Sequence, residues 1–564
     1  MKTRSSKRRK RLLIFTFILL GFAALAFLVP VVQDIVHPVR YIRCDGPELT
    51  RETPYIENGE VASASTTLLR GTKVTLEEKG ETTSTIKYDG GLWLVPNSNL
   101  VESLQDVVSY DTVYPRKLVN LRTEKEGRLS DVVVKKGEPV KVVSVLASDL
   151  NRQTGVIDWF EVEKDGEIYY LPGTYVEMTE EAANKDYSEL FAYNAILDKT
   201  FGDGWSRKEY LESADLKGIP TVIYPDNPLP DDARGVHITL ENAINYKDEL
   251  LQLKNDTELN CLVIALKGPD GRLQYQSDVP ENYFKDTSSV LGYSQLTKKE
   301  LADLIQEYKS AGFYIVGRLE TFADAAFAQD RKDLAIVDNN GEPALYSDDY
   351  WVSPFQRETW EYNADLAEEL ADLGVNEVQF DFVRFPDNTM EDDANNKVNF
   401  RNTYNESKVS ALQGFLSYVH ERLAPKHVYT AADVYSGPIV ESYDYGIGHY
   451  YPAIAAAVDV INPMVYVDIF PGFYFGIEDA GAQCRELIAK FTELAYDEVD
   501  GLQYEPILRM WLQGFNNTSG ERIAKEIRGI HDGGGGGGWL LWTDQGDMED
   551  LNYLKSGMIN ANKP

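Results

Sequence analysis

The sequence predicts an α/β protein: a (β/α)8 barrel preceded by two small all-β barrels and an N-terminal transmembrane helix. Three observations lead to this prediction. Apolar runs alternate with helical patterns over residues 231–560, short alternating runs fill residues 50–180, and an uncharged stretch follows a basic N-terminus. The 564 residues leave room for about three or four domains. A content of 43% hydrophobic and 26% charged residues is typical of globular proteins.

The N-terminal segment predicts a membrane anchor. Residues 1–11 form a basic cytoplasmic tail with seven Lys or Arg, and residues 12–32 are 21 positions without a charge. Such a stretch can cross a bilayer core, and the basic flank favours a cytoplasmic N-terminus. A cleaved signal peptide is the alternative, but no small-x-small cleavage site follows the apolar run. We expect a single-pass protein of the cell membrane whose C-terminal body is extracytoplasmic.

Short alternating runs separated by Gly, Asn and Asp predict two small β-barrels, at residues 50–103 and 108–180. The second resembles the bacterial SH3-like domain in Asn120-Leu121-Arg122, Lys136-Gly137-Glu138 and Trp159-Phe160-Glu161-Val162. The first is similar to a degenerate copy of the same unit. The resemblance implies modules that bind cell-wall glycan or peptide, and a rigid spacer is the alternative. Residues 181–230 predict a helical and irregular connector that ends in a Pro/Asp cluster.

The region from residue 231 to residue 560 predicts the barrel. Its eight apolar runs lie at 234–240, 259–267, 313–322, 377–385, 428–436, 459–467, 507–515 and 538–544. Helical patterns lie between them, each closed by Gly, as at residues 296–312 and 357–374. This alternation is typical of a (β/α)8 barrel. A doubly wound open sheet is the alternative, but no GxGxxG fingerprint follows any run. We expect the glycines at 533–538 to form the loop that enters the eighth strand.

The charge and the motifs of the sequence exclude several classes of function. The formal net charge of -34 argues against nucleic acid as a partner, because a large negative field repels polyphosphate. The three cysteines, Cys44, Cys261 and Cys484, are far apart and give neither a disulfide framework nor a CxxC metal spacing. No GxSxG elbow and no Walker loop occurs in the sequence. We therefore predict no metal and no cofactor.

Polar residues end the apolar runs, where a (β/α)8 barrel carries its active site. They are His237, Lys267, Asp270, Arg318, Glu320, Asp381, Arg384, Asp433, Tyr466, Asp468, Gln513, Trp542 and Asp544. Carboxylates beside an arginine and aromatic rings are typical of a sugar site, because glycoside cleavage needs two carboxyl groups. We select Asp381 and Asp433 as the catalytic candidates, and Lys267, Glu320, Arg384, Tyr466, Asp468, Gln513 and Trp542 as substrate-binding candidates. A structural pair between Asp381 and Arg384 is the alternative for the fourth run, where we expect Pro386 to end the strand.

Several motifs in order resemble a bacterial glycoside hydrolase family that was long catalogued as a domain of unknown function. The most specific is Gln379-Phe380-Asp381-Phe382-Val383-Arg384-Phe385-Pro386, followed by Ala432-Asp433-Val434-Tyr435, Asn462-Pro463-Met464-Val465-Tyr466 and Trp511-Leu512-Gln513. The resemblance covers about residues 222–560 and implies a TIM barrel related to the alpha-amylase clan. It further implies that Asp381 is the nucleophile and Asp433 the acid/base.

These predictions together describe a membrane-anchored, extracytoplasmic glycoside hydrolase. Its substrate would be a cell-envelope or extracellular glycan, a polysaccharide or a glycan of the peptidoglycan type. A non-catalytic glycan-binding protein and a scaffold protein of the cell envelope are the alternatives. Two carboxyl groups within about 5–10 Å of each other across a cleft would distinguish an enzyme from a glycan binder. A scaffold predicts an apolar surface patch and no cleft instead.

Overall fold

The computed structural model describes residues 37–46, 48–57, 60–185, 213–220, 222–291, 296–441, 444–470, 474–516, 518–543 and 548–561. The chain divides into two compact units, one of residues 1–115 and 138–183 and the other of residues 116–137 and 184–564. The expected anchor at residues 12–32 and most of the expected connector lie outside the described residues. Within the described ranges, no helix is both long enough and apolar enough to cross a membrane.

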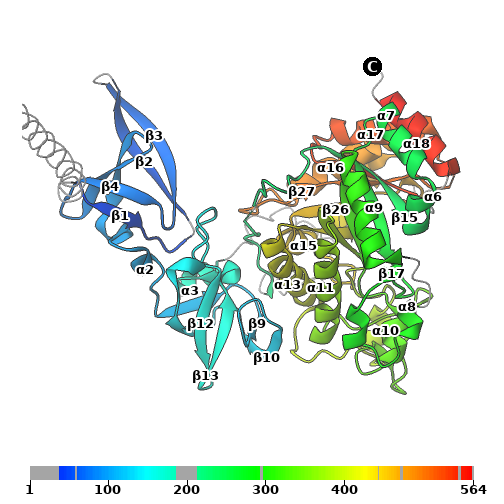
Figure 1. Ribbon diagram of the computed structural model, residues 1–564, viewed down its shortest axis with the longest axis horizontal. Coiled ribbons are helices and arrows are strands. Elements are labelled where there is room, and N and C mark those ends of the chain that lie inside the picture. The colour runs from blue at the N-terminus through cyan, green and yellow to red at the C-terminus, as the bar shows by residue number, and fades with distance from the viewer. Residues whose placement is uncertain are drawn as a thin grey trace, which may run out of the picture. The chain divides into compact units, whose positions relative to one another are not determined.

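The described part of the first unit consists mainly of β-strands, as the sequence predicts, with two short α-helices, α2 (Leu104–Val107) and α3 (Glu180–Ala183) (Figure 1). One sheet has the strand order β6-β5-β4-β1-β7, and a separate hairpin joins β2 to β3. The strands are β1 (Val39–Ile42), β2 (Glu48–Glu57), β3 (Glu60–Leu69), β4 (Lys73–Glu78), β5 (Thr83–Tyr88), β6 (Gly91–Pro96) and β7 (Leu100–Val101). Alternate residues face the core, where Val74, Ile86 and Val95 are buried.

A second group of antiparallel strands completes this unit. It runs β13-β12-β11-β8-β14. The strands are β8 (Thr112–Pro115), β11 (Val140–Ser144), β12 (Trp159–Lys164), β13 (Glu167–Pro172) and β14 (Val176–Glu177). Phe160, Val162 and Leu171 are fully buried among them. The SH3-like character of the two sheets and the predicted domain boundaries stay predictions.

A short hairpin at residues 116–137 belongs to the second unit. Its strands β9 (Val119–Arg122) and β10 (Leu129–Val134) pair antiparallel. Arg122 Nη2 lies 2.9 Å from Glu421 Oε2, and Arg128 Nη1 lies 2.9 Å from Glu361 Oε2. These ion pairs tie the hairpin to two helices of the barrel, and the Arg122 pair is buried.

The second unit contains a closed barrel of eight parallel strands. They are β15 (Ala233–Thr239), β16 (Cys261–Lys267), β19 (Tyr314–Glu320), β23 (Glu377–Asp381), β25 (Tyr429–Tyr435), β26 (Val460–Met464), β28 (Met510–Gln513) and β29 (Gly538–Trp542). Their order is β25-β23-β19-β16-β15-β29-β28-β26, and a further pairing of β25 with β26 closes the ring. Closure confirms the predicted TIM barrel and excludes the open doubly wound sheet.

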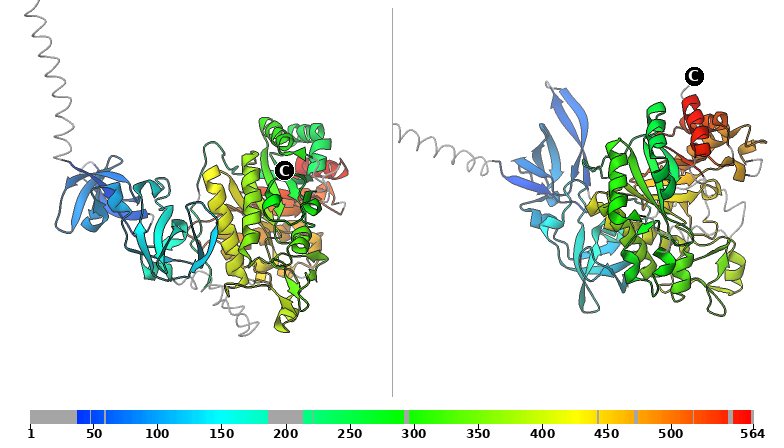
Figure 2. Two further views of the ribbon diagram at one scale, coloured as in Figure 1. Left: turned by 60° about the horizontal axis from the view of Figure 1, so that its bottom comes forward. Right: turned by 45° about the vertical axis from the view of Figure 1, so that its right-hand side comes forward.

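The helices lie outside this ring of strands (Figure 2). They include α7 (Lys247–Asp256), α9 (Lys298–Ser310), α11 (Arg357–Asp372), α13 (Lys408–Leu423), α16 (Cys484–Asp497), α17 (Gly520–Asp532) and α18 (Met548–Ala561). Each presents an apolar stripe to the barrel, as α9 does with Leu301, Ile305 and Tyr308. The α9 start is fixed by a capping box between Thr297 and Glu300.

The glycine run at 533–538 connects α17 to β29, as predicted. The last two glycines, Gly537 and Gly538, let the backbone pass close to the carbonyl oxygens of neighbouring strands. A Cβ on Gly538 would lie 1.9 Å from the carbonyl oxygen of Ala233, and Gly538 has a φ of +97°. A Cβ on Gly537 would lie 2.3 Å from the carbonyl oxygen of Leu508. Only glycine lets β29 start between its two neighbours, so the run is a structural joint.

Candidate functional site

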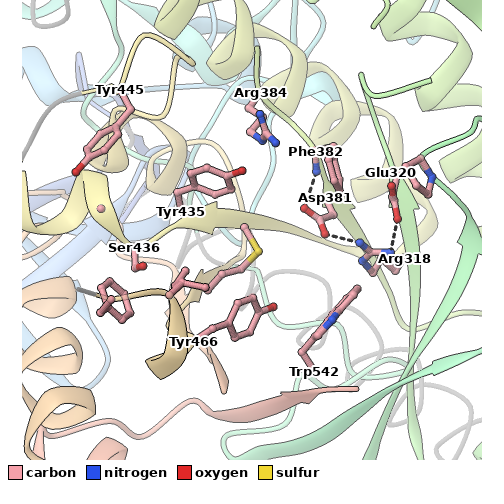
Figure 3. A pocket seen from close by; sticks show the side chains of 15 residues that line it. Arg318, Glu320, Asp381, Phe382, Arg384, Tyr435, Ser436, Tyr445, Tyr466 and Trp542 are labelled. Atoms are coloured by element: carbon pink, nitrogen blue, oxygen red, sulfur yellow. Dashed lines mark hydrogen bonds and ion pairs between the residues drawn. The ribbon is translucent and has the colours of Figure 1, made fainter. Parts of the chain in front are cut away.

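A pocket of about 580 Å³ opens at the carboxyl ends of the barrel strands (Figure 3). Its lining residues are Pro269, Arg318, Glu320, Asp381, Phe382, Arg384, Tyr435, Ser436, Gly437, Tyr445, Met464, Tyr466, Ile469, Phe470 and Trp542. Five of the predicted site residues are among them: Glu320, Asp381, Arg384, Tyr466 and Trp542. They come from the ends of β19, β23, β26 and β29, which is where the active sites of TIM barrels lie.

Arg318 is the centre of the polar part of the pocket. Its Nη1 donates to Glu320 Oε1 at 3.0 Å, and its Nη2 donates to Asp381 Oδ2. Its Nε lies 3.9 Å from Asp433 Oδ2. Arg318 and Glu320 are two apart on β19, so both side chains point into the barrel. One buried cation thus faces three buried carboxyl groups.

Burial, together with the charge of neighbouring Asp381, raises the pKa of two of these carboxyl groups. Burial raises the pKa of Glu320 to about 7, and Arg318 opposes this shift only in part. The pKa of Asp433 is raised well above its usual value by burial and then by the negative charge of Asp381. Low dielectric surroundings and like charges both favour the protonated acid. Glu320 therefore exchanges a proton near neutral pH.

Asp381 is the last residue of β23, and the backbone turns sharply after it. Phe382 has a left-handed φ of 47°, and its N–H donates to Asp381 Oδ1 at 2.6 Å. The prediction that Pro386 ends this strand is wrong: the turn at Phe382 ends it earlier, at Asp381. Because the strand has ended, Arg384 can face the same pocket as Asp381. The two do not pair with each other, since Asp381 binds Arg318.

Arg384 lies in a cage of aromatic rings. Its guanidinium carbon lies 4.8 Å from the ring centre of Trp351, 5.1 Å from that of Phe382 and 4.8 Å from that of Tyr435. Its Nη1 donates to the carbonyl oxygen of Phe385 at 3.1 Å and lies 3.2 Å from Asp387 Oδ2. The rings fix the plane of the guanidinium at the pocket wall.

Trp542 forms another wall. Its ring stacks on His237 at 4.0 Å and meets Trp511 edge-on at 5.6 Å, while the guanidinium of Arg318 lies 4.6 Å from its ring centre. Burial and the charge of Arg318 lower the pKa of His237 to about 3, so the imidazole is neutral. His237 is therefore a fixed support for the Trp542 ring. Together with Tyr435, Tyr445 and Tyr466, this ring gives the pocket faces suited to flat, partly apolar ligands.

Four predicted site residues are not among those that line the pocket: Lys267, Asp433, Asp468 and Gln513. Lys267 is fully buried, where its Nζ lies 2.7 Å from Asp324 Oδ2 and donates to the carbonyl oxygen of Glu320 at 2.8 Å. Asp433 lies deeper in the barrel and accepts from Trp511 Nε1 at 2.7 Å. Their predicted roles in catalysis and binding stay predictions.

Asp468 and Gln513 bind each other. Gln513 Nε2 donates to Asp468 Oδ2 at 2.5 Å, and Gln513 Oε1 accepts from the backbone N–H of Asp468 at 3.0 Å. Arg522 Nη1 lies 2.8 Å from Asp468 Oδ1. This network fixes the loop after β26 against β28 and α17. Within the described ranges, no group of three or more His, Cys, Asp or Glu side chains is arranged to hold a metal ion.

Sequence reasoning assigned no role to several pocket residues. Arg318 lies within the third apolar run, two residues before Glu320, so period-two spacing could have placed both on the inner face. Tyr445 and Phe470 come from loops after β25 and β26. No pattern in the sequence distinguishes these loop aromatics from others.

Comparison with known proteins gives the family. A family model described as "Putative glycosyl hydrolase domain" matches residues 235–547, which is more than half of the chain. The chain belongs to this family. The match covers all eight barrel strands except the first two residues of β15, and it includes Arg318, Glu320 and Asp381. No curated protein matches the sequence significantly.

Solved structures similar to this family member include proteins from several bacteria. A hypothetical protein from Ruminiclostridium thermocellum ATCC 27405 is 23% identical, covering 35% of this chain and 97% of that chain, with a TM-score of 0.30. The PgaB (BpsB) glycoside hydrolase domain from Bordetella bronchiseptica is 13% identical, covering 59% and 100%, with a TM-score of 0.41. An alpha-galactosidase from Thermus thermophilus is 10% identical, covering 87% and 93%, with a TM-score of 0.34.

Proposed function

We propose that this protein is a membrane-anchored, extracytoplasmic glycoside hydrolase that acts on a cell-envelope or extracellular glycan. The family and the barrel support hydrolysis of glycans in general. One observation carries the finer proposal: two pocket-lining carboxyl groups, those of Glu320 and Asp381, bind adjacent nitrogens of the Arg318 guanidinium. The cell-membrane location rests on the basic tail and the uncharged segment at residues 12–32.

In this proposal Asp381 is the nucleophile. It would attack the anomeric carbon while the glycosidic oxygen leaves, which gives a covalent glycosyl ester and a free alcohol. Arg318 and the N–H of Phe382 hold both Asp381 oxygens, so the carboxylate is oriented before substrate arrives. Water would then hydrolyse the ester and restore Asp381.

Glu320 is the proposed acid/base. Its pKa of about 7 suits a group that donates a proton to the leaving oxygen and then takes one from water. The resemblance favoured Asp433 for this role. Asp433, however, is not among the pocket-lining residues and accepts from Trp511, so Glu320 is better placed to reach a glycosidic oxygen. We assign the buried Asp433 to positioning Arg318.

The stereochemical outcome follows from spacing. Retaining glycosidases hold their carboxyl groups about 5–5.5 Å apart, and inverting ones about 6.5–9.5 Å apart. Glu320 and Asp381 share one guanidinium, whose width limits their separation. We therefore propose retention. A binder would need no such pair of neighbouring acids, one of them with its pKa raised to about 7, which favours an enzyme over the glycan-binding alternative.

The test is a hydrolysis screen of purified full-length protein against bacterial envelope glycans and aryl glycosides of both anomers. We expect Asp381→Asn to lower turnover by several orders of magnitude and to keep the fold. Asp372→Asn, at an exposed site on α11 paired with Lys426, is the matched control. Hydrolysis that survives Asp381→Asn in a folded protein would reject the proposal.

A further inference from the structure

The pocket contains a second buried arginine that the hydrolysis mechanism does not use. Arg384 is only 4% exposed, lines the pocket, and takes no part in the contacts among Arg318, Glu320 and Asp381. Its Nη1 is the only one of its nitrogens with a partner among the described residues: the carbonyl oxygen of Phe385, with Asp387 nearby. The Nε and Nη2 N–H groups have no acceptor in that part of the chain. Neither nitrogen is among the described side-chain atoms that are both buried and without a partner, so this edge is accessible from the pocket that Arg384 lines.

The unpaired edge has a defined shape. Nε and Nη2 carry two parallel N–H donors on one side of the planar guanidinium, and this fork matches the two oxygens of a carboxylate. The rings of Trp351, Phe382 and Tyr435 hold the plane in place, so little side-chain freedom remains to be lost on binding. A neutral hydroxyl group would occupy only one of the two donors.

The charges around the pocket also favour a ligand with a carboxylate. Arg318 already pairs with Asp381 and Glu320 and has Asp433 nearby. Among the described residues, Arg384 has only Asp387 within ion-pair distance. That carboxylate is 28% exposed and also accepts from the hydroxyl of Tyr435 at 3.3 Å. With Glu320 protonated, as the proposed acid must be, the lining side chains carry more positive than negative charge.

We propose that the pocket takes a sugar that bears a carboxylate, and that Arg384 binds this carboxylate through Nε and Nη2. The inference rests on the proposed function, because it treats the pocket as the sugar-binding site, and it adds the substrate class: an acidic glycan, such as one containing a uronic acid. Arg384 is a specificity residue in this assignment. The reaction itself is carried by Asp381 and Glu320.

The experiment compares ligands that differ only in charge, and it measures binding so that it does not depend on turnover. Full-length protein is titrated calorimetrically with oligosaccharides of galacturonic acid, of galactose and of glucosamine, each at up to millimolar concentration. We expect the acidic oligosaccharide to bind about 10- to 100-fold more tightly than the neutral one, the range of a charge-assisted bidentate contact. Arg384→Gln should abolish this preference, and Arg384→Lys should keep part of it.

Two further variants complete the design. Arg485→Gln removes a half-exposed arginine that pairs with Asp532 on the outside of the barrel, and it should leave the preference unchanged. Asp387→Asn removes the competing carboxylate and should tighten binding of the galacturonic acid oligosaccharide. This variant tests the inference even if Arg384→Gln does not fold. Tighter binding of the neutral or amino sugar, equal binding of all three, no binding of any, or a preference that persists in Arg384→Gln would each overturn the inference. None of these results affects the hydrolysis screen with Asp381→Asn, which tests the proposed function separately.

Discussion

Phe382 has a backbone conformation that few bulky residues adopt, and it does so beside the proposed nucleophile. A left-handed φ of 47° costs a non-glycine residue about 1–2 kcal/mol. The ring is fixed by Trp351, 5.9 Å away, and by the guanidinium of Arg384. The strain ends β23 at Asp381 and turns Arg384 toward the pocket. Backbone strain of this kind persists where surrounding contacts hold it, and it concentrates at functional sites.

The first prediction concerns the proton of Glu320. If Glu320 is the acid, kcat/KM should fall as the pH rises through about 7, because the proton it must donate is lost there. In Glu320→Gln this alkaline limb should disappear, and substrates with good leaving groups should suffer least. An alkaline limb that remains in the variant would assign the proton to another group.

The raised pKa of Glu320 also makes the stability of the fold depend on pH. The pKa of Glu320 is raised from 4.5 to about 7 on folding, so the folded chain holds a proton that the unfolded chain releases. Stability from this group is therefore highest below about pH 4.5 and is lost as the pH rises through about 7. Thermal melts at about pH 5 and pH 8 should show the wild type losing more stability than Glu320→Gln over this interval.

The sequence could predict those site residues whose inward direction follows from the alternation of side chains along a strand. Glu320, Asp381 and Trp542 lie on the inner face of regular strands, so their position at the mouth follows from period two. The position of Lys267 does not follow from period two, because the register of β16 shifts between Ala265 and Lys267. Its ammonium instead contacts Asp324 and Asn363, behind the strand. Partners that distant in the sequence leave no pattern in it.

At the scale of elements, the Lys267–Asp324 pair holds the end of β16 to the loop that follows β19. Both side chains are fully buried, and Lys267 also binds the carbonyl oxygens of Glu320 and Thr321. Lys267→Met leaves Asp324 buried without its cation, so we expect a loss of about 3–5 kcal/mol in the free energy of unfolding. Urea titration measures it. The double variant with Asp324→Asn should recover part of the loss, and simple additivity of the two changes would contradict the pairing.

The glycine joint before β29 gives an element-scale prediction with an internal control. Gly538→Ala places a Cβ 1.9 Å from the carbonyl oxygen of Ala233 at a φ of +97°, so the start of β29 must move away from β15. We expect a destabilisation of at least about 3 kcal/mol, or failure to fold. Gly536→Ala in the same loop meets nothing within 4 Å and should change stability by less than about 0.5 kcal/mol. Equal effects of the two changes in denaturant titrations would contradict this account.

The extent of each strand was less predictable than its existence. All eight apolar runs coincide with barrel strands, because buried parallel strands are apolar on both faces. The fourth run was predicted to reach Phe385, but β23 ends at Asp381. Hydropathy continues through Phe382 and Val383, both of which pack against other parts of the barrel, whereas the left-handed turn at Phe382 has no signature in composition.

At the scale of the whole molecule, the strongest remaining sequence feature is the N-terminal segment. A net charge of -34 makes the body highly soluble, so the protein would stay at a membrane only through a dedicated anchor. Residues 12–32 are long enough for the proposed anchor, and the seven basic residues before them would set its orientation. Adsorption of the acidic body to an anionic bilayer is unfavourable and cannot imitate this anchor.

The last prediction tests this anchor. We expect full-length protein to remain in the membrane fraction after washing with high salt and with alkaline carbonate, since neither treatment extracts a spanning helix. Protease added outside intact cells should remove the barrel, because the basic tail keeps only the first residues in the cytoplasm. A variant that lacks residues 12–32 is the control and should be soluble inside the cell. Recovery from the medium of a mature protein that begins after residue 32 would show a cleaved signal peptide instead, and protection of the barrel from external protease would contradict the orientation.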